Sequence, residues 1–168
     1  MPLTLQVPDE YGQKQIPLKL RVANQIPSNS YVLLVAASTF FINTTHVLLT
    51  SKYRKASGLV YPAPYASNEQ ADKDPKAYQF NCAQRAHANF TENQPSFLGA
   101  LLISGLRFPV ASAVLGAGWT LSRILYAFGY TSGAGPKGRT RGSIGSFLFD
   151  TALKFTSTYT ALAMIMNW

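Results

Sequence analysis

A chain of 168 residues is long enough for one soluble domain or for four membrane crossings. Fifteen Lys and Arg against seven Asp and Glu give a formal charge of +8, yet only 13% of the residues are charged, well below the roughly 25% of a soluble domain. A single cysteine excludes an internal disulfide framework and a cysteine-rich zinc site. The basic residues are spread over short segments that flank apolar runs, so we expect no nucleic-acid partner.

The N-terminal half of the chain contains one clear membrane-span candidate. Residues 1–30 are polar and are interpreted as an N-terminal extension, and residues 31–168 as a membrane domain. Residues 31–49 carry no charged side chain apart from His46, and this length suffices to cross the hydrocarbon core of a bilayer. Residues 50–79 are polar again and contain three prolines, which is typical of a connector.

The segment 80–105 allows two interpretations. Its second half, PSFLGALLISG, is apolar, whereas its first half, FNCAQRAHANFTEN, is polar enough to fail a simple hydropathy threshold. If the segment stays outside the membrane, the chain has three spans; if it crosses, its polar half must face protein or water. On a helix, Arg85, Asn89 and Glu92 fall on one stripe that a bundle can hide, so the pattern favours a fourth span.

Two further apolar segments complete the predicted architecture. Residues 109–130 contain one charge, Arg123, and residues 145–168 are interrupted by Asp150 and Lys154, whose spacing allows them to pair on one helical face. Residues 131–138 contain three glycines and a proline and are expected to break the helix. We therefore predict an all-α integral membrane protein, a bundle of four transmembrane helices near 31–49, 80–105, 109–130 and 145–168.

The distribution of basic residues predicts an orientation in the membrane. With four spans, the loops 50–79 and 131–142 share one side, and the other side holds Lys14, Lys19, Arg21 and Arg107. By the positive-inside bias, the more basic side is cytosolic and both termini lie across the membrane. The cytosolic side would then hold Lys52, Arg54, Lys55, Lys73, Lys76, Lys137, Arg139 and Arg141.

A second polar stripe, formed by Arg123, Tyr126 and Tyr130, repeats the helical spacing of the first. We expect the two stripes to face a common site, although tyrosines near the end of a span are more often interface anchors. Arg85 needs a partner in a bundle, and Glu92, about 10 Å along the same helix, is expected to be too distant for direct contact. Either another helix supplies the partner in a structural polar network, or a zwitterionic ligand places its carboxylate on Arg85 and its amine on Glu92.

The two histidines do not suggest a metal centre. His46 and His87 lie on separate predicted helices, and no Cys, Asp or Glu stands at ligand spacing from either of them. We therefore expect no metal site.

Several motifs resemble those of a known family. The run FNCAQRAHAN at 80–89, followed by Glu92 and Pro95, resembles the second-helix signature of the MAPEG family, the membrane-associated proteins of eicosanoid and glutathione metabolism. This variant is most similar to the microsomal glutathione S-transferase 3 branch. The run RILYAFGY at 123–130 resembles the third-helix signature, RTRG at 139–142 resembles the RSRG that follows it, and Val60-Tyr61-Pro62 also fits. The resemblance covers roughly residues 31–168.

The resemblance implies a homotrimer of four-helix protomers that binds glutathione, the cosubstrate, between neighbouring protomers near the cytosolic face. The catalytic arginine of the family corresponds to Arg139, or to Arg141 if the alignment is shifted. Asn93 departs from the pattern, because leukotriene C4 synthases carry a tyrosine there. The residues implied for glutathione binding are Arg54, Arg85, His87, Asn89, Glu92, Asn93, Arg123, Tyr126 and Tyr130.

The function implied is a glutathione-dependent transferase and peroxidase. It would conjugate glutathione to apolar electrophiles or reduce lipid hydroperoxides that enter from membrane lipids, with a loop arginine stabilising the thiolate. Such a protein is expected in the endoplasmic reticulum or another endomembrane, with the mitochondrial outer membrane as an alternative. Two other functions remain open: a non-catalytic lipid-binding scaffold of the same superfamily, and a structural tetraspan subunit of a membrane complex.

Overall fold

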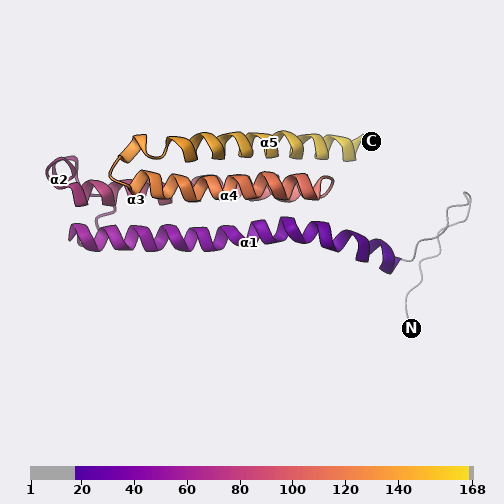
Figure 1. Cartoon of the computed structure of the whole chain (residues 1–168), viewed down its shortest axis with the longest axis horizontal. Helices are drawn as coiled ribbons and strands as arrows, with labels where there is room; N and C mark the ends of the chain where they lie inside the picture. The colour runs from indigo at the N-terminus through magenta and orange to yellow at the C-terminus, as the bar shows by residue number, and fades with distance from the viewer. Residues whose placement is uncertain (1–17, 167–168) are drawn as a thin grey trace, which may run out of the picture.

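The computed structural model describes the backbone of residues 18–166 and the side chains from residue 29 onward (Figure 1). Within this range the chain is helical and contains no β-strand. The elements are the α-helices α1 (Leu18–Ser57), α2 (Asn68–Lys73), α3 (Pro75–Gly105), α4 (Pro109–Thr131) and α5 (Thr140–Ile165), and the 3-10 helix η1 (Gly135–Lys137).

The four long helices form an antiparallel bundle (Figure 1). Helices α3 and α4 pack against each other and against both remaining long helices, whereas α1 and α5 lie on the outer sides. Helix α2 and η1 lie at one end of the bundle, which we call the α2 end, and the short turn between α3 and α4 lies at the opposite end. The two loops predicted to share one side of the membrane therefore lie at the same end of the bundle.

Local sequence signals explain where α3 and α4 begin. The Asp74 side chain accepts a 2.9 Å hydrogen bond from the backbone N–H of Lys76, and Pro75 occupies the first helical position, where no N–H is needed. Residues 106–108 form the turn, and Pro109 likewise occupies the start of α4, although Phe108 before it gives no side-chain cap. Such a short connection forces α3 and α4 to run antiparallel and side by side.

The core of the bundle is a layer of large side chains contributed by all four long helices. The rings of Phe97 and Trp119 are stacked with centroids 3.7 Å apart, and Leu101 and Leu153 are fully buried. His46 of α1 is also buried and stacks on Phe90 of α3 at 4.9 Å. The apolar half of α3 thus anchors the bundle and holds its polar half in place.

The surface of the single chain is unusually apolar. Two helical stretches among the described residues, 29–57 and 109–131, are long and apolar enough to cross a membrane; the 18-residue apolar parts that qualify them have mean hydropathies of 1.8 and 1.2. Large side chains such as Phe41 on α1 and Phe147 and Phe155 on α5 are 69–76% exposed. Apolar surface of this extent is typical of contact with lipid or with another protein chain.

The predicted elements agree with the structure in kind but differ in their bounds. Helix α1 begins at Leu18, so residues 18–30 continue the helix that carries the first predicted span. Helices α3 and α5 each begin five residues before the predicted spans, at Pro75 and Thr140. Residues 1–17 and 167–168 lie outside the described residues. The predicted pairing of Asp150 with Lys154 is confirmed by an ion pair on α5.

Candidate functional site

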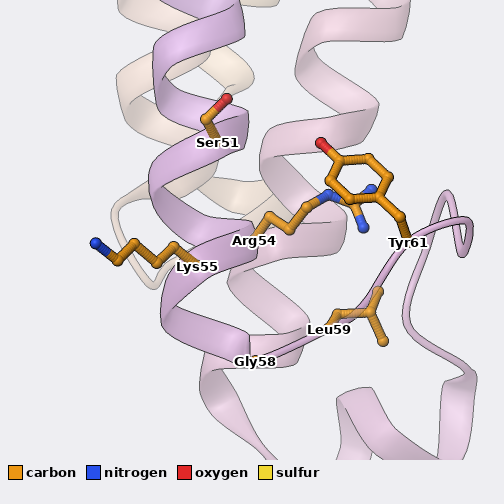
Figure 2. Close-up of a pocket in the computed structure, with 6 residues that line it drawn as sticks. All are labelled: Ser51, Arg54, Lys55, Gly58, Leu59 and Tyr61. Atoms are coloured by element: carbon orange, nitrogen blue, oxygen red, sulfur yellow. The ribbon is translucent and has the colours of Figure 1, made fainter.

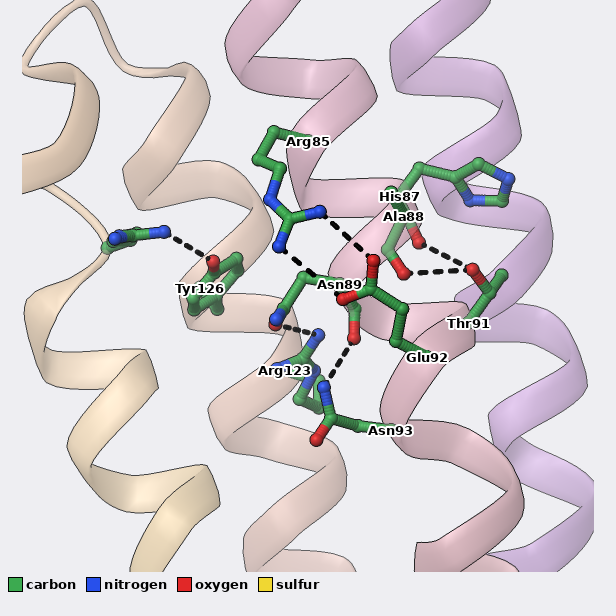
Figure 3. A network of polar contacts seen from close by, with 10 residues as sticks. Arg85, His87, Ala88, Asn89, Thr91, Glu92, Asn93, Arg123 and Tyr126 are labelled. Atoms are coloured by element: carbon green, nitrogen blue, oxygen red, sulfur yellow. Dashed lines mark hydrogen bonds and ion pairs between the residues drawn. The ribbon is translucent and has the colours of Figure 1, made fainter.

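Two charged side chains on the outer face of α3 form a direct ion pair. Arg85 Nη1 lies 3.0 Å from Glu92 Oε1, and Nη2 lies 3.5 Å from Oε2, with the side chains 48% and 52% exposed (Figure 3). The expectation that these residues are too far apart for direct contact is wrong. Because both side chains are long, they can extend toward each other along the helix and close the gap of two turns. We call Arg85 and Glu92 the outer pair.

Asn89 lies between the members of the outer pair and connects α3 to α4. Its side-chain oxygen accepts a 2.9 Å hydrogen bond from Arg123 Nη2, and its backbone carbonyl accepts one of 2.7 Å from Asn93 Nδ2 (Figure 3). The Arg123 guanidinium is buried and lies over the rings of Phe90, Trp119 and Tyr126 at 4.7–5.7 Å. The two polar stripes, which we expected to face a common site, are joined by this one hydrogen bond between Arg123 and Asn89.

A second group of residues lies nearer the α2 end, between α3, α4 and the start of α5. Tyr126 and Tyr130 are buried and meet edge to face at 5.7 Å, and they pack against Cys82 and Ala86 of α3. Arg139 Nη1 donates a 2.9 Å hydrogen bond to the hydroxyl of Tyr126, and its guanidinium lies 4.8 Å from the centre of the Tyr130 ring. We call Cys82, Ala86, Tyr126, Tyr130 and Arg139 the inner cluster.

Glycines bring Arg139 to the tyrosines. Gly129 of α4 and Gly138 of the following loop approach so closely that a Cβ on either would collide with the backbone of the other. At Gly142, a Cβ would collide with the backbone of Tyr126 and Ser122. The loop can therefore fold back on the end of α4, and the first turn of α5 can lie directly against it. Arg139, which immediately precedes α5, is thereby held beside Tyr126.

The structure distinguishes the two arginines that the sequence left open. Arg139 is half-buried and contacts both tyrosines of the inner cluster, whereas Arg141 is exposed. Of the two, the structure brings only Arg139 into this cluster.

His87 is not brought to the outer pair. Its side chain lies on the α1 side of α3 (Figure 3), and its ring centroid is 6.1 Å from that of His46. A residue two positions after Arg85 is rotated by about 200° around the helix, so the periodicity predicts this separation. Among the described residues, no group of three His, Cys, Asp or Glu side chains could hold a metal ion.

Arg54 lies at the end of α1, where the first loop encloses its guanidinium (Figure 2). The group lies 4.2 Å from the centre of the Tyr61 ring and 4.5 Å from that of Phe80, and Nη1 donates a 2.9 Å hydrogen bond to the carbonyl of Ala63. An open pocket of about 370 Å³ adjoins it, lined by Ser51, Arg54, Lys55, Gly58, Leu59 and Tyr61. Arg54 is the only predicted binding residue that lines this pocket.

Sequence reasoning did not identify two features of the site. Cys82 and Ala86 form the wall of the inner cluster, and their spacing of four residues, one helical turn, was the available signal. Gly129, Gly138 and Gly142 determine the approach of α5 to α4, but a glycine in the sequence does not reveal which backbone it will meet.

The geometry defines what the site can do chemically. The inner cluster holds a permanently charged guanidinium beside two phenols in a half-buried setting, where a neighbouring anion would be stabilised. The outer pair offers one positive and one negative group at the surface, with the Asn89 amide between them. Together they can hold a polar molecule with charged ends and stabilise negative charge at one point along it.

These features are those of a helical membrane protein with a polar site built into the α2-end half of its bundle. A model of the MAPEG family matches residues 32–159, which include both polar stripes and the loop arginines. The chain belongs to the MAPEG family. The family includes glutathione transferases and related enzymes, and glutathione is generally their substrate.

Proposed function

We propose that the protein is a glutathione-dependent transferase and peroxidase of the microsomal glutathione S-transferase 3 type. The observation that carries this proposal is the hydrogen bond from Arg139 to Tyr126 inside the inner cluster, because it holds a cation where a thiolate needs one. The family match makes glutathione the substrate to expect.

The proposed site uses both groups of residues. Arg85 would hold a carboxylate of glutathione, Glu92 its amine and Asn89 an amide of its backbone, while Arg123 keeps Asn89 oriented. Tyr126 and Tyr130 would face the cysteinyl part, next to Arg139. The family resemblance also assigns Arg54, His87 and Asn93 to binding, and we propose that they shape the surrounding walls, since each already contacts its own chain.

The role of Arg139 follows from the chemistry of the thiol. An unperturbed thiol has a pKa near 8.5, so only a few per cent is the nucleophilic thiolate at neutral pH. A fixed guanidinium lowers this pKa, because it favours the charged form. The thiolate can then add to an apolar electrophile with an activated double bond or an epoxide: the carbon–sulfur bond forms as the π bond or a carbon–oxygen bond breaks, and the resulting anion takes up a proton. Alternatively, two glutathione molecules reduce a lipid hydroperoxide to an alcohol and water and leave as glutathione disulfide.

We further propose that all four long helices span the membrane and that three protomers assemble around shared sites. The outer pair is half exposed, and the surface of α3 beyond it is apolar. This combination supports the presence of a neighbouring chain that covers this face of α3. The polar half of α3 would then face protein rather than lipid. The detergent-solubilised protein should have a protein mass near three times 18.4 kDa. A monomer that retains full turnover would contradict the shared site.

The α2 end is proposed to face the cytosol, because it holds Lys52, Arg54, Lys55, Lys73, Lys76, Lys137, Arg139 and Arg141. The membrane is proposed to be the endoplasmic reticulum or another endomembrane, where apolar electrophiles and lipid hydroperoxides dissolve.

The central experiment is a thiolate difference spectrum of the purified protein mixed with glutathione. We expect thiolate absorbance to appear at neutral pH and to saturate with glutathione concentration, because binding and ionisation are coupled at the site. Binding without thiolate formation would instead favour a non-catalytic scaffold. The absence of any glutathione binding would favour a structural tetraspan subunit.

A further inference from the structure

The pocket beside Arg54 contains no residue of the inner cluster or of the outer pair. It encloses about 370 Å³ between the last two turns of α1 and the loop that follows (Figure 2). Its polar lining comes from Ser51, Arg54 and Lys55, and none of the described residues that line it is acidic. The ion pairs found within the described part of the chain involve neither Arg54 nor Lys55. The pocket is therefore positively charged and suited to an anion.

The guanidinium of Arg54 is held in place by its own chain. The rings of Tyr61 and Phe80 lie 4.2 and 4.5 Å from it, and Nη1 donates a hydrogen bond to the carbonyl of Ala63. This bond uses one of five N–H donors, which a guanidinium presents in a rigid fork that matches the oxygens of a phosphate. Lys55 lines the same pocket and is exposed, so its ammonium group can turn toward a bound anion.

The end of α1 repels an anion less than an uncapped helix end would. The last carbonyl groups of a helix carry partial negative charge. Here the carbonyl of Arg54 accepts a 2.9 Å hydrogen bond from Ser57 Oγ, and that of Lys55 accepts one of 3.4 Å from the backbone N–H of Gly58. The two basic side chains in this last turn oppose the remaining helix dipole.

An apolar stripe on α1 leads from the pocket toward the middle of the bundle. It consists of four large side chains that are 46–76% exposed and precede Ser51 at helical spacing, namely Phe40, Phe41, Val47 and Leu48. The ten residues from Phe41 to Ser51 rise by about 15 Å, which is the hydrocarbon depth of one bilayer leaflet. One face of α1 thus combines a cationic pocket with an apolar track of the length of an acyl chain.

We propose that this pocket binds the head group of an anionic phospholipid in the leaflet on the α2 side, with one acyl chain along the apolar stripe. The phosphate lies against Arg54 and Ser51, and Lys55 neutralises the remaining charge of the head group. This site goes beyond the proposed glutathione chemistry and depends only on α1 crossing the membrane with its last turns at the surface.

A second copy of the chain fits the pocket less well than a lipid does. Copies in one membrane share their orientation, so a neighbour presents its own α2 end at this height. That end carries eight basic residues against three acidic ones, Glu69, Asp72 and Asp74. Glu69 already pairs with Lys73, and Asp74 caps α3. Charge complementarity therefore favours an anionic lipid.

The test measures the binding of phosphatidylinositol and phosphatidylcholine, with identical acyl chains, to the full-length protein in detergent micelles by native mass spectrometry. Only phosphatidylinositol carries a net negative charge, and the wild type should bind it at least about fivefold more tightly. Lys55→Gln should weaken this binding about fivefold, the effect of one basic residue near an anionic lipid. Binding of phosphatidylcholine should not change.

The matched control is Lys52→Gln, which removes the same charge about one turn earlier from an exposed residue that does not line the pocket. It should leave phosphatidylinositol binding near the wild-type value. An equal loss in both variants would show a general attraction to the basic α2 end and would overturn the pocket. Ser51→Phe fills the pocket without changing charge and should also weaken binding; unchanged binding in this variant overturns the proposal too.

Glycerophosphoinositol, which has the head group but no acyl chains, distinguishes a lipid from a soluble phosphate. At equal concentration it should not displace phosphatidylinositol, and displacement would overturn the lipid assignment. Equal binding of both phospholipids to the wild type, the result expected if a second copy covers the pocket, overturns it as well. Glutathione affinity, measured alongside, should be unchanged in Lys55→Gln. Failure of the wild type to bind glutathione would refute the proposed function and leave the lipid site standing.

Discussion

The inner cluster and the outer pair both include residues of the polar half of α3, yet they are held in different ways. Arg139 is fixed by residues of its own chain: the hydroxyl of Tyr126 accepts its hydrogen bond, and the ring of Tyr130 lies beneath its guanidinium. Arg85 and Glu92 are about half exposed and hold only each other in the contacts described. One chain can thus preorganise the arginine that we propose as catalytic, whereas the surroundings of the pair that we propose for binding would be completed by a ligand or a neighbouring chain.

The largest expected effect is a loss of turnover when Arg139 is removed from the inner cluster. Arg139→Ala should lower turnover by about 10²-fold or more, the scale seen when one preorganised donor is removed from an active site, while glutathione affinity changes little. The pKa of the bound thiol should rise, because the cation that favours the thiolate is gone. Turnover should then recover only as the pH rises through that higher pKa. Stopped-flow spectra over a pH series measure both effects.

The control for this substitution is Arg141→Ala, which removes an equal charge from an exposed position one residue into α5 and should leave turnover near the wild-type value. Arg139→Lys should rescue only part of the loss, since a single ammonium group lacks the planar fork. If Arg141→Ala causes the larger loss, the inner cluster does not hold the catalytic arginine.

The next effect concerns the outer pair. Arg85→Ala should weaken glutathione binding by about 10- to 100-fold, because a charge-assisted contact to a carboxylate is lost. Turnover at saturating glutathione should change far less than it does in Arg139→Ala, which would separate binding from activation. Isothermal titration of the assembled protein gives the affinity. An affinity equal to that of the wild type removes Arg85 from the site.

A smaller effect tests how the inner cluster is positioned. Gly142→Ala would push a methyl group into the backbone of α4, so we expect a loss of about 1–3 kcal/mol in the free energy of unfolding, together with lower turnover. Gly99→Ala is the matched control: it lies in α3, where a Cβ meets no atom within 4 Å, and should leave turnover unchanged. Thermal unfolding in detergent compares the two. Equal unfolding temperatures and turnover would show that close packing at Gly142 does not position Arg139.

The smallest effect is expected at Arg54. Arg54→Lys keeps the charge but loses the planar contact with Tyr61 and the hydrogen bond from Nη1 to the carbonyl of Ala63, so the first loop should be cleaved faster by added protease. The effect on stability should be about 1 kcal/mol, and glutathione affinity should change less than in Arg85→Ala. Lys55→Gln, at the neighbouring exposed position, is the control. A loss of affinity as large as that of Arg85→Ala would instead make Arg54 a direct ligand contact.

Much of the architecture could be predicted from hydropathy and helical periodicity, since both report which residues face inward. Periodicity also predicted that the stripes containing Asn89 and Arg123 face a common site, but the hydrogen bond between these two residues is seen only in the structure. It missed the Arg85–Glu92 contact because rise per residue measures the distance between backbone positions and ignores the length of the side chains. The start of α1 was missed because a helix that continues beyond the apolar segment leaves no mark in a hydropathy window.

Other parts of the site depend on the folded chain. The guanidinium of Arg54 lies between the rings of Tyr61 and Phe80, which are 19 residues apart in the chain. The sequence positions of these residues do not reveal that they meet in space. The choice between Arg139 and Arg141 likewise needed the position of α5 against α4. A difference of two residues at a helix start directs two side chains to opposite environments.

The turn at residues 106–108 determines which residues of α3 and α4 lie at the same height in the bundle. Asn89 lies 16 residues before the end of α3 and Arg123 lies 14 residues after the start of α4, so both stand about 21–24 Å from the turn. Their hydrogen bond exists because the two lengths agree. One inserted residue within α4 before Arg123 would move that arginine by about 1.5 Å along the helix and rotate it by about 100° around the helix axis. A residue inserted within the turn itself could be accommodated by a longer loop, without a shift of either helix. Tolerance to insertions should therefore change abruptly at Pro109.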